Sequence, residues 1–434
     1  MNPSGSTSSG STPFGSAHLR ANPRVGSPLV GNPLGDRPRP GPPGRLIRSF
    51  ADLTSERFDR GRPVVTLFSG GLDSSYLLHR LAKAGFTDIH AVSVDLGAAE
   101  APEDLRLVTD RLSVRLHVVD GRRQFADEYV RPAIAAQAVY LDTHPVSSSL
   151  SRPLIAKLAM DIAVGLGAWG VLHTANRSQN TLRRLNGALG LLGYQGHYGS
   201  PYDLDPVDRD RKARELAEIG LVHMSNRVAS IDANLWCREF ESGVLDDPEE
   251  HTVPEHLYRW SVRDEGVPDE TVEIGFIEGV PVSVDGTHLP LHHLVDRLNR
   301  RAGAHGIGRY SGLEHLPGGQ KVLELREMPA AALLLKTYRH LETATLDAET
   351  VREKMHIEQI WVREALEGRW FGELRQASQS FVESCAARVT GTVRWRLRPG
   401  SADTLSIVAA SPRYVRSRED WERESIRADG PVGL

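Results

Sequence analysis

The sequence predicts an α/β protein whose first half contains a parallel sheet and whose second half is α+β. Between residues 63 and 173, short apolar runs alternate with stretches of helical period. This alternation is typical of strand–helix–strand units, which form parallel sheets covered by helices on both faces. After about residue 200 the alternation is lost, and strand pairs and long helical stretches follow.

Composition divides the chain into four segments. Residues 1–45 are rich in Gly, Ser and Pro, which predicts a disordered tail. Their shortage of acids also resembles a transit peptide, but the prolines disfavour the amphipathic helix that such a peptide uses. We expect an α/β domain at 46–220, an α+β domain at 221–414 and a polar C-terminal tail at 415–434.

The elements of the first half are predicted in order. Residues 46–60 have the pattern of a short amphipathic helix that leads into the first strand. Strands are predicted at 64–68, 89–94, 114–119 and 169–173, with helices around 77–81 and at 104–112, 122–140 and 153–166. Ligands of such sheets bind at the carboxyl ends of the strands.

The second half is predicted to begin with a hairpin. Its strands, 272–276 and 280–284, join at Glu278-Gly279, and a helix at 289–302 lies behind them. Three helical stretches follow at 329–344, 348–366 and 371–389. The last hairpin pairs 392–397 with 404–409 across Pro399-Gly400.

Charge and cysteine content exclude several classes of function. A net charge of −4 over 434 residues gives no field that would hold a polyanion, so we expect no nucleic-acid partner. No apolar run approaches the ~20 residues of a membrane helix, so we expect no membrane contact. Cys237 and Cys385 form no CxxC motif, which favours a reducing, cytoplasmic setting.

Chemistry is concentrated at the end of the first strand, in FSGGLDSS at 68–75. A strand that stops at Ser-Gly-Gly and at once begins a helix leaves several backbone N–H groups directed at an anion. The glycines let phosphate oxygens approach, and the hydroxyls add donors. A plain helix start with a Gly-Gly turn is the alternative. The predicted nucleotide-binding residues are Ser69, Gly70, Gly71, Asp73, Ser74 and Ser75, with Asp73 also binding Mg²⁺.

The SGGxDS pattern resembles the pyrophosphate-loop ATPases, whose members cleave ATP between the α and β phosphates. Neither GxxxxGK[ST] nor a GxGxxG in this context is present, which excludes a kinase-type loop and a dinucleotide fold. The resemblance implies that ATP and Mg²⁺ are used and that AMP is transferred. Residues 46–220 would then be the ATP-binding domain, and 221–414 would serve substrate binding and oligomerisation.

Further segments resemble argininosuccinate synthase. YVRPAI at 129–134, AVY at 138–140 and SRPLIAK at 151–157 are similar to the central segment of that family. SIDANL, FESGVLDDP, GVPV and HGIGR follow in the same order, at 230–235, 240–248, 279–282 and 305–309. The resemblance covers about 64–414. Members couple citrulline to aspartate: the ureido oxygen attacks ATP, pyrophosphate leaves, and the aspartate amine displaces AMP.

The resemblance implies further site residues. Val94 and Asp95 match positions that hold adenosine, although Asp95 also suits a strand-end cap. Asp73 and Arg152 would be catalytic, and Arg152 has a structural alternative in the first turn of its helix. The predicted residues on the citrulline side are Tyr140, Ser148, Asn180, Arg184, Ser230, Glu241 and Glu327, with Arg184 facing a carboxylate and the two glutamates an ammonium.

Two stretches depart from the family. HGxTGKGNDQVRFE is replaced by HTANRSQNTLRRLN at 173–186, so the residues that hold aspartate become Asn176 and Thr181. Thr181 cannot supply the anionic partner that an α-ammonium needs. VLELREMPAA at 322–331 replaces SRGVYETPGG, and a later tyrosine becomes Leu335, which changes one wall of the acceptor pocket. Simple drift in an ordinary member is the alternative.

We therefore expect an AMP-forming C–N ligase of amino-acid metabolism. It would adenylylate a ureido, amide or carboxyl oxygen of an amino-acid substrate and join it to an amine, as a specialised relative of argininosuccinate synthase. The alternatives are a true argininosuccinate synthase of arginine biosynthesis and a non-catalytic nucleotide-binding regulator. Sulfur transfer to RNA would need paired catalytic cysteines and a basic surface, which this sequence lacks.

The C-terminus bears on assembly. Members of the family end with a long helix that reaches other subunits of a tetramer. Residues 415–434 contain too few apolar residues to bury a helical face. We expect a homodimer formed through the helices between 329 and 389.

Overall fold

The computed structural model describes residues 44–55, 59–97, 105–222, 230–241, 243–250, 252–263 and 266–427. Most of the predicted tail at 1–45 lies outside the described residues, as do residues 428–434. Gly44 belongs to the fold, because its N–H donates to the carbonyl of Gln195 at 2.9 Å.

A six-stranded parallel sheet organises the first half. Its strands run in the order β1-β8-β7-β2-β3-β4, and every neighbouring pair is parallel. They are β1 (Leu46–Ile47), β2 (Val64–Leu67), β3 (Ile89–Asp95), β4 (Arg115–Asp120), β7 (Gly170–Leu172) and β8 (His197–Gly199). The sequence prediction of a parallel sheet is confirmed.

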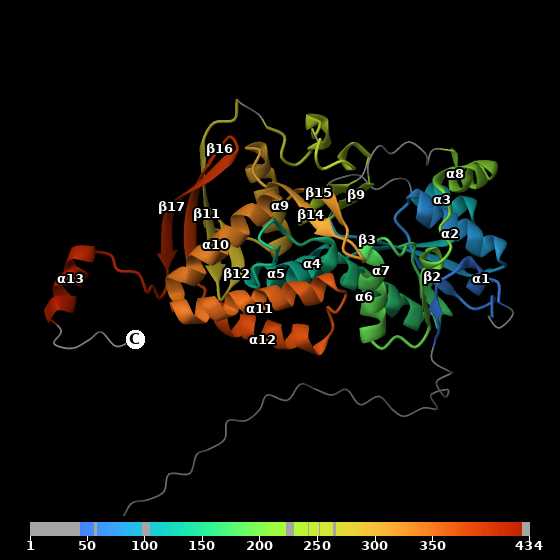
Figure 1. The fold of residues 1–434 in the computed structure, drawn as a ribbon, viewed down its shortest axis with the longest axis horizontal. Helices are drawn as coiled ribbons and strands as arrows, with labels where there is room; N and C mark the ends of the chain where they lie inside the picture. Colours follow the sequence, from blue (N-terminus) through green and yellow to red (C-terminus); the bar gives the residue numbers. More distant parts are fainter. Residues whose placement is uncertain are drawn as a thin grey trace, which may run out of the picture. The chain divides into compact units, whose positions relative to one another are not determined.

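Helices cover both faces of this sheet because successive residues of β2 point to opposite sides. Val64 packs in one core cluster with α1 (Phe50–Leu53), α2 (Leu72–Lys83), α3 (Leu105–Arg111) and α8 (Arg209–Glu218). Val65 packs in another with α6 (Ser148–Gly165) and α7 (Asn180–Leu191). Figure 1 shows the sheet between these two groups of helices.

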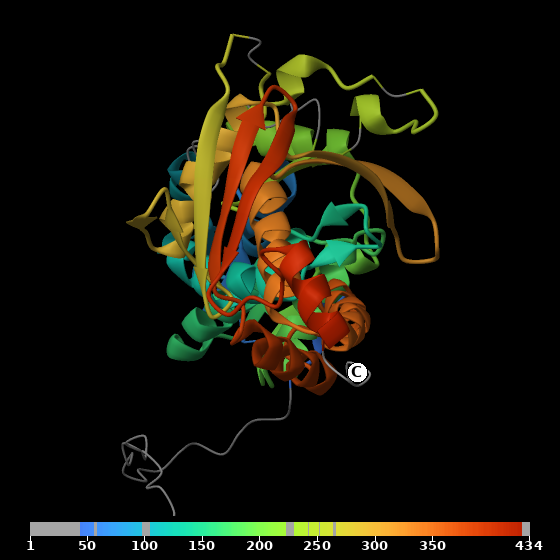
Figure 2. The same cartoon turned by 90° about the vertical axis from the view of Figure 1, so that its left-hand side faces the viewer.

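Two antiparallel sheets form the second half. One contains β9 (Ser230–Ala233), β10 (Arg238–Glu241), β14 (Arg309–His315) and β15 (Lys321–Glu327), in the order β14-β15-β10-β9. The other has the order β13-β12-β11-β16-β17, and Figure 2 shows β11, β16 and β17 side by side. Its strands are β11 (Glu270–Ile277), β12 (Val280–Val284), β13 (Thr287–His288), β16 (Gly391–Arg398) and β17 (Ser401–Ala409).

Four long helices share one core with the second sheet, and α9 and α10 pack directly against it. They are α9 (Leu291–Ala304), α10 (Pro329–Thr345), α11 (Ala348–Leu366) and α12 (Glu373–Ala386), close to the predicted ranges. The predicted turn at Glu278-Gly279 has φ values of 49° and 78°. Positive φ at both central residues is typical of a two-residue hairpin turn.

Two predicted helices are wrong in part. In place of a helix over 46–60, β1 pairs with β8, and Ser49 caps the four-residue α1. The predicted helix over 122–140 is divided into α4 (Arg122–Phe125), the π-helical turn η1 (Ala126–Val130) and α5 (Arg131–Ala135). Pro132 has no N–H to continue the α-helical bonding, and Gln137 at φ 45° ends the segment.

The remaining elements are short. β5 (Val139–Tyr140) pairs with β6 (His144–Pro145), and 3-10 turns occur at η2 (Pro201–Asp203), η4 (Gly243–Leu245) and η5 (Glu255–Leu257). The last helix, α13 (Arg418–Arg427), stands apart from the four long helices in Figure 1. The side chains of its Trp421 and Ile426 are 48% and 82% exposed.

Three further predictions concern the whole chain. Among the described residues, no helix is long and apolar enough to cross a membrane. Cys237 and Cys385 are buried free thiols, and the cytoplasmic setting inferred from them stays a prediction. The domain limits also stay predictions.

Candidate active site

The loop after β2 has the geometry of an anion site. Gly70 adopts φ 74°, which favours glycine, and turns the chain directly into α2. Gly71 is the N-cap of α2 and has no side chain to accept bonds from the first turn, so that turn offers its N–H groups to a ligand. Ser69 and Ser74 hold the turn, with their hydroxyl oxygens 3.3 Å apart.

A second feature of the loop is an unused hydroxyl. Ser75 is fully buried in the first turn of α2, and its Oγ has no hydrogen-bond partner among the described residues. A buried polar atom is rarely left without a partner in a native protein. The observation fits a site that a ligand completes.

Asp73 is paired with a residue that the sequence did not single out. The Nζ of Lys212, on α8, donates to Asp73 Oδ1 at 2.5 Å. The Lys212 side chain is only 11% exposed, whereas that of Asp73 is 48% exposed. Tyr202 fixes the same turn, because its hydroxyl donates to the Asp73 carbonyl at 2.9 Å. Sequence reasoning missed Lys212 because it lies 139 positions away in a helix without a motif.

The acids near this loop do not form a closed metal cage. Among the described residues, no group of three or more His, Cys, Asp or Glu side chains is arranged to hold a metal. Mg²⁺ commonly binds one or two carboxylates and takes its other ligands from phosphates and water. The single, half-exposed carboxylate of Asp73 fits that kind of binding.

Val94 and Asp95 lie at the carboxyl end of β3, the strand next to β2. Asp95 Oδ1 accepts from the N–H of Gly97 at 2.8 Å, so its carboxylate caps the strand end. Arg122 approaches the same carboxylate at 3.7 Å. The cap and the predicted adenosine contact are compatible, because half of the Asp95 side chain is exposed.

Because α6 begins at Ser148, five residues before the predicted start, Arg152 lies in the second turn and not in the first. It pairs with Asp232 of β9 at 2.5 Å. Its side chain is 18% exposed and that of Asp232 is 31% exposed. The pair therefore joins the parallel-sheet half to the antiparallel sheet while remaining in contact with solvent.

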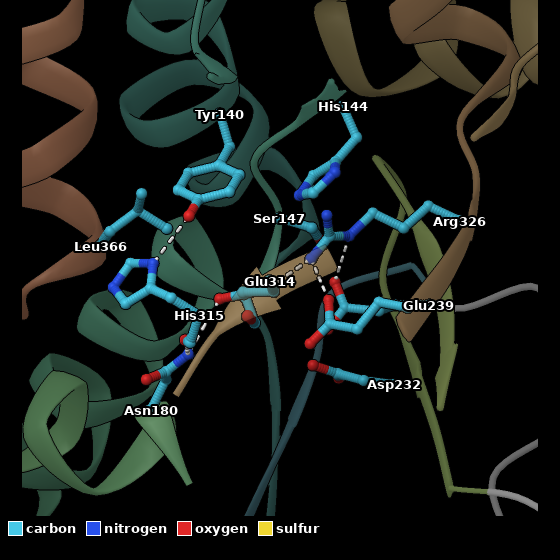
Figure 3. A network of polar contacts seen from close by, with 12 residues as sticks. Tyr140, His144, Ser147, Asn180, Asp232, Glu239, Glu314, His315, Arg326 and Leu366 are labelled. Carbon is cyan, nitrogen blue, oxygen red and sulfur yellow. Dashed lines mark hydrogen bonds and ion pairs between the residues drawn. The ribbon is translucent and has the colours of Figure 1, made fainter. Parts of the chain in front are cut away.

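The structure brings four predicted substrate residues into one network, and Figure 3 shows two of them, Tyr140 and Asn180, beside Glu314 and His315. Arg184 donates to Ser148 Oγ at 2.7 Å and to Glu314 Oε1 at 2.8 Å, and its Nε donates to the carbonyl of Leu366. Asn180 donates to the same Glu314 oxygen at 3.0 Å. The Tyr140 hydroxyl lies 2.9 Å from His315 Nδ1.

Arg326 is the centre of this network. It is 3% exposed, and it donates to Glu239 at 2.9 Å, to Glu314 at 2.7 Å and also to Glu324. Glu324 and Arg326 belong to the stretch at 322–331 in which the sequence departs from the family it resembles. They lie two residues apart on β15, so their side chains share one face.

The three carboxyls around Arg326 differ in their pKa values. Burial raises the pKa of Glu239 well above its usual range, and Asp232 adds to this. Burial and the neighbouring glutamates raise the pKa of Glu324 to about 12. Burial opposes ionisation of Glu314 too, but Arg184 and its hydrogen bonds lower the pKa of that carboxyl. Glu324 is accordingly protonated and donates to ionised Glu314.

The carboxylate of Glu327 is hydrogen-bonded by other groups of the protein. It is fully buried, and Oε1 accepts from the N–H groups of Trp260 and Ser261 at 2.9 and 2.8 Å. Oε2 accepts from Arg238 at 2.9 Å. These bonds hold β15 against the segment at 259–261, and the predicted contact of Glu327 with a substrate ammonium stays a prediction.

The other predicted substrate residues do not belong to the network around Arg326. Glu241 is half-buried at the end of β10, and burial raises its pKa. The backbone of Ser230 pairs with that of Glu241. Asn176, in the loop before α7, accepts from the N–H and hydroxyl of Ser178 at 3.0 and 2.6 Å. Thr181 lies in the first turn of α7 and is half-buried.

Comparison with known proteins assigns the family. Residues 63–189 match the model of the arginosuccinate synthase N-terminal HUP domain, and residues 229–417 match the arginosuccinate synthase C-terminal domain. Argininosuccinate synthase of Rubrobacter xylanophilus is 35% identical over 370 residues, which cover 84% of this chain and 90% of the relative. The chain belongs to the argininosuccinate synthase family.

Two other argininosuccinate synthases give the same result. The protein of Symbiobacterium thermophilum is 37% identical over 351 residues, covering 78% of this chain and 86% of its own length. The protein of Methanopyrus kandleri is 35% identical over 388 residues, which cover 86% of this chain and 96% of the relative. As a member of the argininosuccinate synthase family, the chain is an ATP-dependent, AMP-forming C–N ligase.

Lys212 generates a prediction about the nucleotide. Because Lys212 is the cation next to the loop, Lys212→Met should raise the ATP concentration for half-maximal AMP formation by about tenfold or more, as expected for loss of a charge-assisted bond. The matched control is Lys157→Met, since Lys157 pairs with Asp161 of the same helix and with no other acid among the described residues. If steady-state assays of Lys212→Met show an unchanged dependence on ATP concentration, Lys212 does not contribute to ATP binding.

Proposed function

We propose that this chain is a specialised member of the argininosuccinate synthase family that couples an amino-acid acceptor to an amine other than aspartate. It would adenylylate a ureido, amide or carboxyl oxygen of the acceptor with ATP, and the amine would displace AMP. The observation that carries this proposal is the segment 173–186, which contains no Asp or Glu and three arginines. An α-ammonium on the incoming amine would meet cations there.

The surroundings of this segment support the proposal. Thr181 stands at the amino end of α7, where the helix dipole favours anions. Arg177 is held by Asp203 at 3.0 Å, and Arg183 by Glu367 at 3.0 Å, so the nearest acids are already paired. An incoming amine without an α-ammonium, or with additional acidic groups, suits this end of α7 better than aspartate.

The acceptor side supports an amino acid. Tyr140, Ser148, Asn180 and Arg184 come from β5, α6 and α7 and converge on Glu314 and its neighbour His315. Asn180 Oδ1 is buried without a partner among the described residues, so an acceptor that donates a hydrogen bond would satisfy it. A true argininosuccinate synthase with citrulline and aspartate is the second candidate, and this part of the site favours it equally.

The chain's own residues would divide the chemistry as follows. The loop at 69–75 would orient the ATP phosphates through backbone N–H groups, and Lys212 would screen their charge. Arg152 would stabilise the charge that develops between the two substrates, held in direction by Asp232. Mg²⁺ would bind Asp73 and screen the phosphates when ATP is present.

The first test addresses the nucleotide-binding loop. Asp73→Ala removes the carboxylate for the metal, and Gly70→Val places a branched side chain at φ 74°, so each should reduce AMP formation by a factor of about 100 or more. Gly167→Val is the matched control, because Gly167 has φ 59° and open space around it. ATP–pyrophosphate exchange measures the effect, and exchange at wild-type rate in both loop variants would refute the nucleotide assignment.

The second test addresses the amine. L-Aspartate should be a poor nucleophile, and Thr181→Asp should improve kcat/KM for it by about tenfold, because it supplies a carboxylate for the α-ammonium. Thr181→Asn, which has a similar size and no charge, should not. If the native chain makes argininosuccinate as efficiently as an ordinary member of the family, the specialised role is wrong.

The third test addresses assembly. We propose a homodimer, because α13 exposes its few apolar side chains and offers no continuous apolar stripe. Size exclusion with light scattering should give twice the chain mass, with or without residues 415–434. A tetramer that dissociates on this truncation would show that α13 does hold subunits together.

A further inference from the structure

A pocket of about 430 Å³ lies between η1–α5, the β11–β12 turn and α12, and it shares no residue with the candidate active site. Its volume lies in the range of about 300–1,000 Å³ that is usual for small-molecule sites. Both signs of charge line it: η1–α5 contributes Glu128 and Arg131, α12 contributes Arg375 and Glu383, and the β11–β12 turn contributes Glu278.

Arg375 is the unusual side chain in this pocket. Its guanidinium lies over Trp370 at 4.0 Å from the ring centre and over Trp361 at 5.3 Å. Its Nε is buried and has no hydrogen-bond partner among the described residues. Burial lowers the pKa of Arg375 to about 10. Stacking on aromatic rings compensates only part of the free-energy cost of burying an arginine. An anion that accepts hydrogen bonds from the guanidinium of Arg375 would compensate more of it.

The β11–β12 turn, which also lines the pocket, is held in a strained conformation. Glu278 has φ 49°, an uncommon value for a residue with a side chain, in the two-residue turn between β11 and β12. The turn is fixed by the segment that follows α12: the Glu278 N–H donates to Thr390 Oγ1 at 2.9 Å and the Gly279 N–H to the Val389 carbonyl at 2.8 Å. A carboxylate is therefore held at the pocket although the backbone there favours Gly or Asn.

The pocket is connected to the acceptor site through the segment between α11 and α12. Trp370 stacks on Tyr129 of η1, with ring centres 4.8 Å apart, while its indole also carries Arg375. A few residues earlier, the Leu366 carbonyl accepts from Arg184, and Glu367 pairs with Arg183 at 3.0 Å. A ligand that moves Arg375 or Trp370 thus acts on a segment that also positions two arginines of α7.

We propose that this pocket is a regulatory site for a zwitterionic amino acid, whose carboxylate binds Arg375 and whose ammonium faces Glu278 and the neighbouring glutamates. The paired charges of the lining match the paired charges of such a ligand. The Leu366–Trp370 segment transmits its binding to Arg184 and so to the acceptor. Binding itself is independent of the function proposed above.

Binding is tested first, on the full-length chain without ATP. The twenty proteinogenic L-amino acids are screened by thermal unfolding, and the strongest stabiliser is titrated by calorimetry together with the amine that lacks its carboxylate. We expect saturable binding of the amino acid, loss of binding for the amine, and about tenfold or weaker affinity in Arg375→Gln. Arg388→Gln, an exposed arginine just beyond the same helix, should bind like the wild type.

Glu278→Asn provides a second variant, because Asn tolerates positive φ and keeps the fold while removing the charge. It should also weaken binding. Equal affinity in wild type, Arg375→Gln and Glu278→Asn would place the ligand elsewhere and overturn the proposal, as would the absence of binding by all twenty amino acids. If Ala387→Arg, at the rim, only converts an oligomer to a smaller one, the pocket is a subunit contact and the proposal is wrong.

The regulatory part is tested by ATP–pyrophosphate exchange. The bound amino acid should change the acceptor concentration for half-maximal exchange in the wild type and in Arg388→Gln, but not in Arg375→Gln. If the amino acid binds but does not change the acceptor concentration for half-maximal exchange, the pocket binds a ligand without regulating the reaction. The regulatory claim would then be wrong. Absence of exchange under all conditions would instead refute the proposed ligase reaction, while the calorimetric result would stand.

Discussion

The buried contact between Arg184 and Glu314 joins the two halves of this structure, and the candidate site depends on it. Arg184 belongs to α7 on the parallel sheet, Glu314 belongs to β14 of an antiparallel sheet, and both are 3% exposed. Removal of one partner from such a buried pair typically costs about 3–5 kcal/mol, because the other charge is left without compensation. Arg326, Asn180 and Ser148 gather around the same pair. The acceptor region thus depends on contacts between distant parts of the chain, of which the Arg184–Glu314 pair is the most deeply buried.

The sequence predicted what is encoded locally. The β2–loop–α2 unit could be recognised because an apolar run, two glycines and a helix start follow one another within 20 residues. The helices α9 to α12 were found from their apolar period. β14 and β15 were not predicted, because Glu314, Glu324 and Arg326 occupy inward positions that normally hold apolar residues. In β15 the buried Leu323 and Leu325 do alternate with Glu324 and Arg326, but such a pattern predicts that the charged residues are exposed, whereas here they are buried too. Lys212 and Arg326 were missed as site residues because only tertiary contacts connect them to Asp73 and Arg184.

The residues inferred from the family resemblance fall into two kinds. The first turn of α2 still offers its N–H groups to a ligand, and the Asp73 carboxylate is half-exposed although it pairs with Lys212. The donors and acceptors of Glu327 and Arg184, in contrast, are engaged by the protein itself. A sequence match identifies a position and not the state of its side chain. The stretch at 322–331 gives a second example. Its sequence departs from the family, yet Glu324 and Arg326 are buried in the network and are not exposed at the surface.

The carboxyls of Glu239 and Glu324 around Arg326 bind protons more tightly in the folded state than in the unfolded chain. The pKa values of Glu239 and Glu324 are raised in the fold, whereas an unfolded chain releases these protons near the ordinary glutamate value of about 4.3. Their contribution to stability is therefore complete below that value and is lost as the pH rises toward the raised values. At neutral pH the native chain holds more protons than the unfolded chain does. Rising pH therefore weakens the region around Arg326, where these carboxyls lie.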